Sequence, residues 1–197
     1  MTRKIFIPML LILAVLSACV PAKSSPDVVM MDKPTEDAEK ASDDMMAAPA
    51  WLSASLTNVR TGENFMISDF KGKVVLVENM AIWCTTCKKQ QTLVKALHET
   101  SGMNKDLVSV GLDIDPNENA SDLKGYIENN GFDWIYAVAP QEVARELGNV
   151  YGAQFLNPPS APILIIDRKG QVHPMPFGIK SVEDLKTFID PFLTENM

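Results

Sequence analysis

Residues 73–89 read KVVLVENMAIWCTTCKK. After Lys73, the run to Met80 is apolar apart from Glu78 and Asn79, which is typical of a strand that is covered on both faces. Cys84 and Cys87 follow it closely, and apolar residues recur at helical spacing from Cys87 to about Thr100. The stretch therefore predicts a buried strand that leads through a Cys-x-x-Cys turn into a helix.

The position of the two cysteines predicts redox chemistry. A cysteine at a helix N-terminus lies near unpaired backbone N–H groups and the positive end of the helix dipole, and both favour the thiolate. Cys84 is therefore the predicted nucleophile, and Cys87, one turn deeper, is the predicted resolving thiol. A spacing of three residues places both sulfur atoms on one helix face, where they can form an intramolecular disulfide.

A metal site is the competing interpretation of this dithiol. Tetrahedral zinc needs two further ligands, and once Cys19 is acylated only His98 and His173 remain, far apart in the sequence. Thiolates also select soft ions, so a Cu(I) metallochaperone or a redox-sensing binding protein stays open as the alternative function. We expect no metal, and no cofactor other than a redox-active Cys84–Cys87 disulfide.

Strand-like and helix-like segments alternate from Trp51 onward, which indicates an α/β domain. A turn at 60–63 predicts an N-terminal hairpin. The expected strands lie at 54–59, 64–67, 73–80, 107–113, 132–138, 163–166 and 171–177, and the expected helices at 87–100, 120–130, 141–150 and 181–192. The capping pattern of Ser181 and Asp184 marks the start of the last helix.

The stretch from Val75 to Cys87 resembles the active-site strand and turn of the thioredoxin superfamily, and the likeness extends over roughly 56–192. It is similar in style to extracytoplasmic lipoproteins of the redoxin and cytochrome-maturation kind, which share the early hairpin and a strand-helix insertion, here about 116–159. The resemblance implies a thioredoxin-like fold, with a central mixed sheet flanked by helices, and thiol-disulfide exchange with protein substrates. Thioredoxins carry Gly-Pro where this chain has Thr85-Thr86, so the direction of electron flow stays open.

The resemblance also implies an acid. Glu78 occupies the place of the buried carboxyl that thioredoxins carry six residues before the first cysteine. Desolvation inside an apolar strand is expected to raise its pKa, which suits it to exchange a proton with Cys87, through water. The alternative is a strand residue whose side chain reaches the edge of the sheet.

A proline before the late strand is the other implied site residue. Pro162 is expected to be the cis-proline of the superfamily, with Pro159 as the other candidate and a trans proline at the strand start as the alternative. Ala161, which precedes it, is expected to offer backbone hydrogen bonds to the substrate. The remaining expected substrate contacts are Trp83, Thr85 and Thr86.

The N-terminal residues 1–19 predict a targeting signal. Arg3 and Lys4 precede an apolar run that is shorter than the ~20 residues of a membrane span. Residues 16–19, LSAC, resemble the lipobox of bacterial lipoproteins, which implies a signal peptide over 1–19 and lipidation of Cys19. Residues 20–50 are polar and lack apolar periodicity, so they are interpreted as a disordered acidic tether before a thioredoxin-like domain over 51–197.

Charge and composition exclude other classes of function. A formal net charge of -7 without a basic patch argues against a nucleic-acid binder, and three cysteines are too few for a scaffold held by disulfides. The expected partners are protein disulfides or dithiols, a membrane or envelope electron donor, and the lipid bilayer through Cys19. The expected location is outside the cytoplasm, anchored to a membrane of a bacterial cell envelope.

Overall fold

The computed structural model describes residues 48–100 and 105–195. The predicted signal peptide, Cys19 and nearly all of the predicted tether lie outside these residues. Within the described ranges, no helix combines the length and the apolar character needed to span a membrane.

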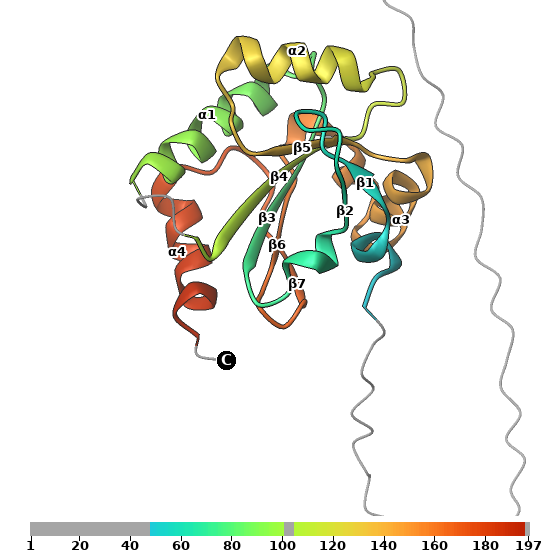
Figure 1. Cartoon of the computed structure of the whole chain (residues 1–197). Helices are drawn as coiled ribbons and strands as arrows, with labels where there is room; N and C mark the ends of the chain where they lie inside the picture. The colour runs from blue at the N-terminus through green and yellow to red at the C-terminus, as the bar shows by residue number, and fades with distance from the viewer. Residues whose placement is uncertain (1–47, 101–104, 196–197) are drawn as a thin grey trace, which may run out of the picture. The chain divides into compact units, whose positions relative to one another are not determined.

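A mixed sheet of five strands forms the centre of the described fold, in the order β5-β4-β3-β6-β7 (Figure 1). The central strand β3 pairs in parallel with β4 and antiparallel with β6, while β5 and β7 form the two edges. The bounds are β3 (Val74–Met80), β4 (Leu107–Asp113), β5 (Ile135–Val138), β6 (Ile163–Ile166) and β7 (Val172–Pro174). The predicted α/β fold with a central mixed sheet is confirmed.

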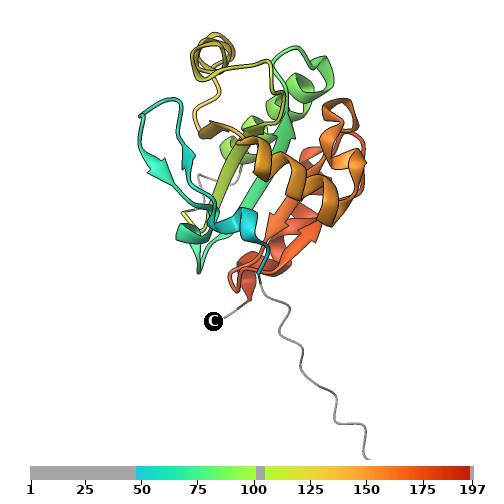
Figure 2. The ribbon, with the colours of Figure 1, turned by 90° about the vertical axis from the view of Figure 1, so that its right-hand side faces the viewer.

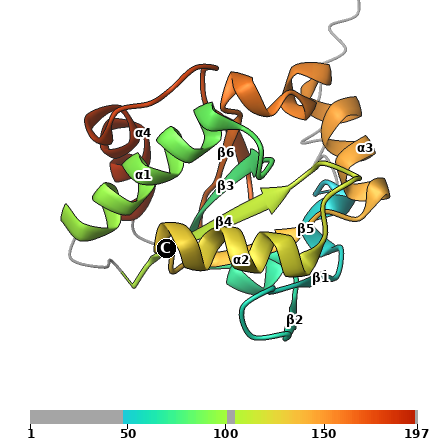
Figure 3. The same ribbon diagram turned by 90° about the horizontal axis from the view of Figure 1, so that it is seen from above.

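Helices cover both faces of this sheet (Figures 1 and 3). Alternate side chains of β3 point to opposite faces: Val74 and Leu76 pack with α1 and α4, whereas Val75 and Val77 pack with α3 and η1. Helix α2 joins the α1 face through Leu123 and Ile127. The bounds are η1 (Ala50–Ser53), α1 (Thr85–Thr100), α2 (Ala120–Asn130), α3 (Gln141–Tyr151) and α4 (Val182–Thr194).

The predicted hairpin is present but shorter than expected. Its strands β1 (Leu56–Thr57) and β2 (Asn64–Phe65) pair antiparallel beside the main sheet (Figure 2). The second strand ends early because residues 67–70 form a 3-10 turn, η2 (Ile67–Phe70), in which Asp69 accepts a hydrogen bond from the Met66 N–H. The hairpin is joined to β5 by a 2.9 Å hydrogen bond from the Val59 N–H to the Tyr136 carbonyl.

Other boundaries differ from the expectations by a few residues. Helix α1 begins at Thr85, directly after the first cysteine, and Ser181 and Asp184 form the predicted capping box of α4. Two short 3-10 helices, η3 (Ala153–Leu156) and η4 (Pro158–Ser160), lie between α3 and β6. They were not predicted because elements of three or four residues show no periodicity in the sequence.

The strand registers place Glu78, Gly111 and Tyr136 in one row across β3, β4 and β5. Residues in such a row point their side chains to the same face of the sheet. A Cβ atom added to Gly111 would lie only 2.2 Å from Cε1 of Tyr136. The tyrosine ring therefore lies over the glycine and extends toward Glu78.

We expect Gly111→Ala to lower the free energy of unfolding by about 1–3 kcal/mol, because the new methyl group must displace a buried aromatic ring. Urea denaturation monitored by circular dichroism measures this loss. The matched control is Gly125→Ala in α2, where an added Cβ meets nothing within 4 Å, and where alanine should stabilise by about 0.5–1 kcal/mol. Equal midpoints for Gly111→Ala and the unmodified chain would contradict the packing argument.

Candidate active site

Cys84 and Cys87 form a disulfide at the N-terminus of α1, with their Cα atoms 5.2 Å apart. This confirms that the two sulfur atoms lie close enough to bond. The Cys87 N–H donates a 3.0 Å hydrogen bond to the Cys84 Sγ. The first free backbone donors of the helix therefore face the sulfur of Cys84, the geometry that favours a thiolate there.

The surroundings of the two sulfur atoms differ. The Cys87 Sγ lies 3.3 Å from the carbonyl oxygen of Pro158, so it faces a partial negative charge where Cys84 faces an N–H group. Both cysteines are buried, Cys84 at 2% exposure and Cys87 at 0%, but Cys84 lies between the exposed Trp83 and Thr85. The disulfide is therefore approachable only from the Cys84 side.

Carboxylates that the sequence analysis did not single out hold the turn before Cys84. Trp83 is 58% exposed, and its indole N–H donates a 2.6 Å hydrogen bond to Asp115. The Ile82 N–H donates a 2.7 Å bond to Glu118. Asp115 has a pKa below its ordinary value because the Asn117 N–H and the Trp83 indole stabilise its charge. The only sequence signal was the Asp-Pro-Asn turn after β4.

Asp113, at the end of β4, is a second buried acid near this turn. It is fully buried, and burial raises its pKa to about 8, with nearby Glu118 adding to the effect. Its Oδ1 accepts a hydrogen bond from the Asp115 N–H, so it also fixes the loop that holds Trp83. An acid at the end of an apolar strand was the available signal in the sequence.

Glu78 lies on the central strand and is 2% exposed, so the alternative of a side chain at the sheet edge is wrong. Burial raises its pKa to about 8, while the charge of Lys180 and the amide of Gln91 oppose that rise. An acid with such a pKa can exist in either protonation state near neutral pH, as a group that exchanges protons requires.

Lys180 is a charged neighbour of Glu78 that was not predicted from the sequence. It is 5% exposed, burial lowers its pKa to about 8 and the charge of Glu78 opposes that fall. Its Nζ donates to the Ala161 carbonyl, and the Gln90 side chain bonds both backbone groups of Lys180, at 2.7 and 3.2 Å. A single lysine before a helix cap gives no signal of burial.

The expectation of a cis peptide bond at Pro162 or Pro159 is wrong, because every peptide bond in the described residues is trans. Ala161 instead adopts a left-handed conformation, with φ 46° and ψ 59°, and thereby turns the chain from η4 into β6. Its N–H donates to the Pro158 carbonyl at 2.8 Å and its carbonyl accepts from Lys180. In this disulfide state both backbone groups expected to contact a substrate are bonded inside the chain.

Thr86, in the first turn of α1, is half-buried, whereas Thr85 is exposed. The predicted substrate contacts therefore differ in whether a substrate can reach their side chains. Trp83 and Thr85 are exposed beside the disulfide, while Ala161 is fully buried.

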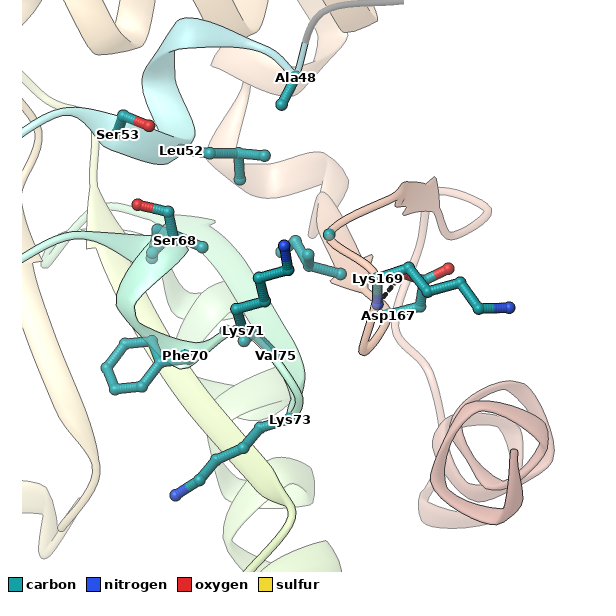
Figure 4. A pocket seen from close by; sticks show the side chains of 13 residues that line it. Ala48, Leu52, Ser53, Ser68, Phe70, Lys71, Lys73, Val75, Asp167 and Lys169 are labelled. Carbon is teal, nitrogen blue, oxygen red and sulfur yellow. Dashed lines mark hydrogen bonds between the residues drawn. The ribbon is translucent and has the colours of Figure 1, made fainter. Parts of the chain in front are cut away.

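Within the described ranges, no three His, Cys, Asp or Glu side chains are grouped so that they could hold a metal ion. A pocket of about 220 Å³ lies at the far end of the sheet, where β3 begins and β6 ends (Figure 4). Its lining includes Leu52, Phe70 and Val75, and no cysteine. It is separate from the dithiol, which follows the other end of β3.

Comparisons with known proteins agree with this geometry. The Redoxin family model matches residues 40–186. The structure is similar to a thiol:disulfide interchange protein of the thioredoxin family from Chlorobium tepidum TLS, with 23% identity, a TM-score of 0.57, and coverage of 71% of this chain and 92% of that one. It is also similar to the thioredoxin domain of a thiol-disulfide oxidoreductase from Bacteroides vulgatus, with 20% identity, a TM-score of 0.53 and coverage of 72% and 93%. A third similar structure is a secreted disulfide oxidoreductase of Mycobacterium tuberculosis, with 14% identity, a TM-score of 0.55 and coverage of 73% and 99%.

Proposed function

The chain belongs to the Redoxin family, and from this we propose that it is a thioredoxin-like thiol-disulfide oxidoreductase that exchanges disulfides with other proteins outside the cytoplasm. The observation that carries the proposal is the unequal environment of one disulfide. An N–H group faces Cys84 and a carbonyl oxygen faces Cys87. Cys84 is thus the attacking thiolate and Cys87 the thiol that resolves.

In the reducing direction, the Cys84 thiolate attacks a substrate disulfide, which forms one mixed disulfide and releases one substrate thiolate. The Cys87 thiol then loses its proton to the Glu78 carboxylate and attacks the Cys84 sulfur. This step forms the Cys84–Cys87 disulfide and releases the second substrate thiolate. Two electrons pass from the dithiol to the substrate, and the oxidising direction is the same sequence reversed.

A protein partner, rather than a small molecule, is favoured by the surface around the disulfide. Besides Trp83, the exposed Phe177 and Ile179 flank Gly178, whose N–H donates to the Ser160 carbonyl in η4, and the ring of Phe177 packs against that of Phe155 in η3. Pro158, whose carbonyl faces Cys87, belongs to the adjoining η4. Isolated apolar residues are normal on surfaces, but a group near a reactive bond indicates an interaction site.

The proposed location depends on the LSAC lipobox resemblance at residues 16–19. The similar protein from Mycobacterium tuberculosis is described as secreted. A lipid on Cys19 would keep the domain at the membrane surface, where an envelope electron donor can reach it. Membrane fractionation of a Cys19→Ser variant tests this part, since the variant should leave the membrane fraction.

The activity test uses residues 45–197, which form one compact unit. We expect this fragment to accelerate the reduction of insulin by dithiothreitol, and expect the alkylated fragment to have no effect. Equilibration of the Cys84–Cys87 couple with glutathione then gives its potential and the favoured direction of exchange. If no disulfide is reduced or formed faster and the reduced protein instead holds one Cu(I) tightly, the copper-binding alternative replaces the proposal.

A further inference from the structure

Among the described residues, four buried side-chain atoms have no hydrogen-bond partner: Glu78 Oε1, Asn79 Oδ1, Gln91 Nε2 and Asp113 Oδ2. Three of these atoms are acceptors, and Gln91 Nε2 is the single donor of the four. A buried donor without an acceptor is costly in a folded protein. The orientation of the Gln91 amide therefore requires a reason.

Two tyrosines set that orientation. Gln91 is fully buried on α1, one turn after Cys87. Its Oε1 accepts hydrogen bonds from the hydroxyls of Tyr126 and Tyr136, each at 3.1 Å. Both lone pairs of the amide oxygen are thus used, and the amide N–H groups must point away from the tyrosines.

Glu78 is the acceptor that this amide approaches. Tyr136 belongs to the row that runs from Glu78 across Gly111, and its ring extends over the glycine toward the acid. Gln91 bonds the hydroxyl at the end of that ring, on the helix face that covers this side of the sheet. The proximity is reflected in the pKa of Glu78, which Gln91 lowers.

We propose that Gln91 is a positioning residue for the proton exchange at Glu78, because the hydroxyls of Tyr126 and Tyr136 hold its amide with the N–H directed at the carboxylate. This inference rests on the proposed function, in which ionised Glu78 accepts the proton of Cys87. A hydrogen bond to the charged form stabilises it. The amide therefore opposes the effect of burial, and the pKa of Glu78 stays lower than burial alone would make it.

The other titratable groups that face Glu78 act differently. Lys180 also stabilises the carboxylate, but through charge and from the α4 side. The pKa values of Tyr126 and Tyr136 are raised, mainly by burial and further by the charge of Glu78. Both phenols therefore stay neutral over the range in which Glu78 titrates, and they can donate to Gln91 throughout.

The test measures the pKa of Glu78 in the full chain with the disulfide formed, from the ¹³C chemical shift of its labelled carboxyl as the pH changes. The signal of Glu78 is the one that disappears in Glu78→Gln. Gln91→Met keeps the side-chain length but removes the donor, and it should raise the pKa of Glu78 by about one unit. Tyr136→Phe leaves the ring over Gly111 and should give a smaller rise. Val94→Ala, which removes a buried side chain from the same helix and leaves a cavity, should not raise the pKa of Glu78.

An unchanged or lowered pKa of Glu78 in Gln91→Met overturns the proposal, as does a rise of the same size in Val94→Ala. If Gln91→Met does not fold, the double variant of Tyr126→Phe and Tyr136→Phe replaces it under the same criterion. Neither Cys84 nor Cys87 titrates in the disulfide form, so the result does not depend on exchange activity. A raised pKa of Glu78 with an unaltered pH dependence of exchange would keep the role of Gln91 and refute that of Glu78 in the cycle.

Discussion

Cys84→Ser is expected to reduce the rate of disulfide exchange by at least about 1000-fold, because it removes the attacking nucleophile. Cys87→Ser should also stop turnover, but one step later. Its Cys84 thiolate can still attack a substrate disulfide, and the mixed disulfide then accumulates because no second thiol resolves it. The two variants should therefore be equally inactive and yet differ in what remains bound.

The structural reason is the contrast between the two sulfur environments. The N–H at the start of α1 points to the Cys84 Sγ, and the exposed neighbours of Cys84 admit a partner. The Cys87 Sγ has a carbonyl oxygen at 3.3 Å and no exposed surface. A serine at 84 thus leaves only a thiol that no substrate reaches.

The measurement is insulin reduction by each variant, followed by non-reducing electrophoresis and mass spectrometry of the protein after exposure to a disulfide substrate. The Cys87→Ser chain should carry a substrate adduct that dithiothreitol releases, and the Cys84→Ser chain should carry none. Thr92→Ser, at an exposed position further along α1, is the control, since it leaves both thiols and the expected substrate contacts in place. An adduct that forms on Cys87 in the Cys84→Ser chain would reverse the assigned order of the cysteines.

Glu78→Gln is expected to stabilise the protein, and increasingly so as the pH rises from about 4.5 to about 8. The folded chain holds the proton of Glu78 up to about pH 8, whereas the ordinary pKa of a glutamate, which applies to the unfolded chain, is 4.5. Between these values unfolding releases a proton, so the unmodified protein loses about 1.4 kcal/mol of stability per pH unit on this account. The amide pays no such cost, and the difference should reach about 4 kcal/mol at pH 8.

Urea denaturation at several pH values gives the free energies of unfolding. Lys180, with a folded pKa of about 8, stays protonated in both states over most of this window. The slope of Asp113 is common to both chains and cancels in the difference. Glu128→Gln, an exposed site on α2, should not produce the slope. A difference that stays flat with pH would show that Glu78 ionises in the folded protein as readily as in the unfolded one.

The parts of the site that the sequence could predict are those that lie next to each other along the chain. Cys84, Cys87 and Glu78 belong to one strand-turn-helix segment. The spacing indicated the two cysteines, and the resemblance of this continuous segment implied Glu78. Lys180 and Tyr136 reach the acid from distant segments. Their placement depends on which strands pair and in which register, and the local periodicity of the sequence does not indicate either.

The error at Pro162 has a related cause. The resemblance implied an isomer, but the local backbone depends on how η4 joins β6, and the left-handed Ala161 makes that turn with a trans bond. The 3-10 segments were likewise invisible, although one of them supplies the Pro158 carbonyl beside Cys87. Short irregular elements at a site are therefore the part that the sequence does not predict.

The ring of Tyr136 above Gly111 also bears on how such a protein can diverge. The two side chains compete for the same space, so a mutation that enlarges residue 111 is better tolerated beside a smaller residue at 136. That replacement would also remove the hydroxyl that binds Gln91. A change of packing at residues 111 and 136 is therefore expected to change the acidity of Glu78 as well, so the two properties are coupled in evolution.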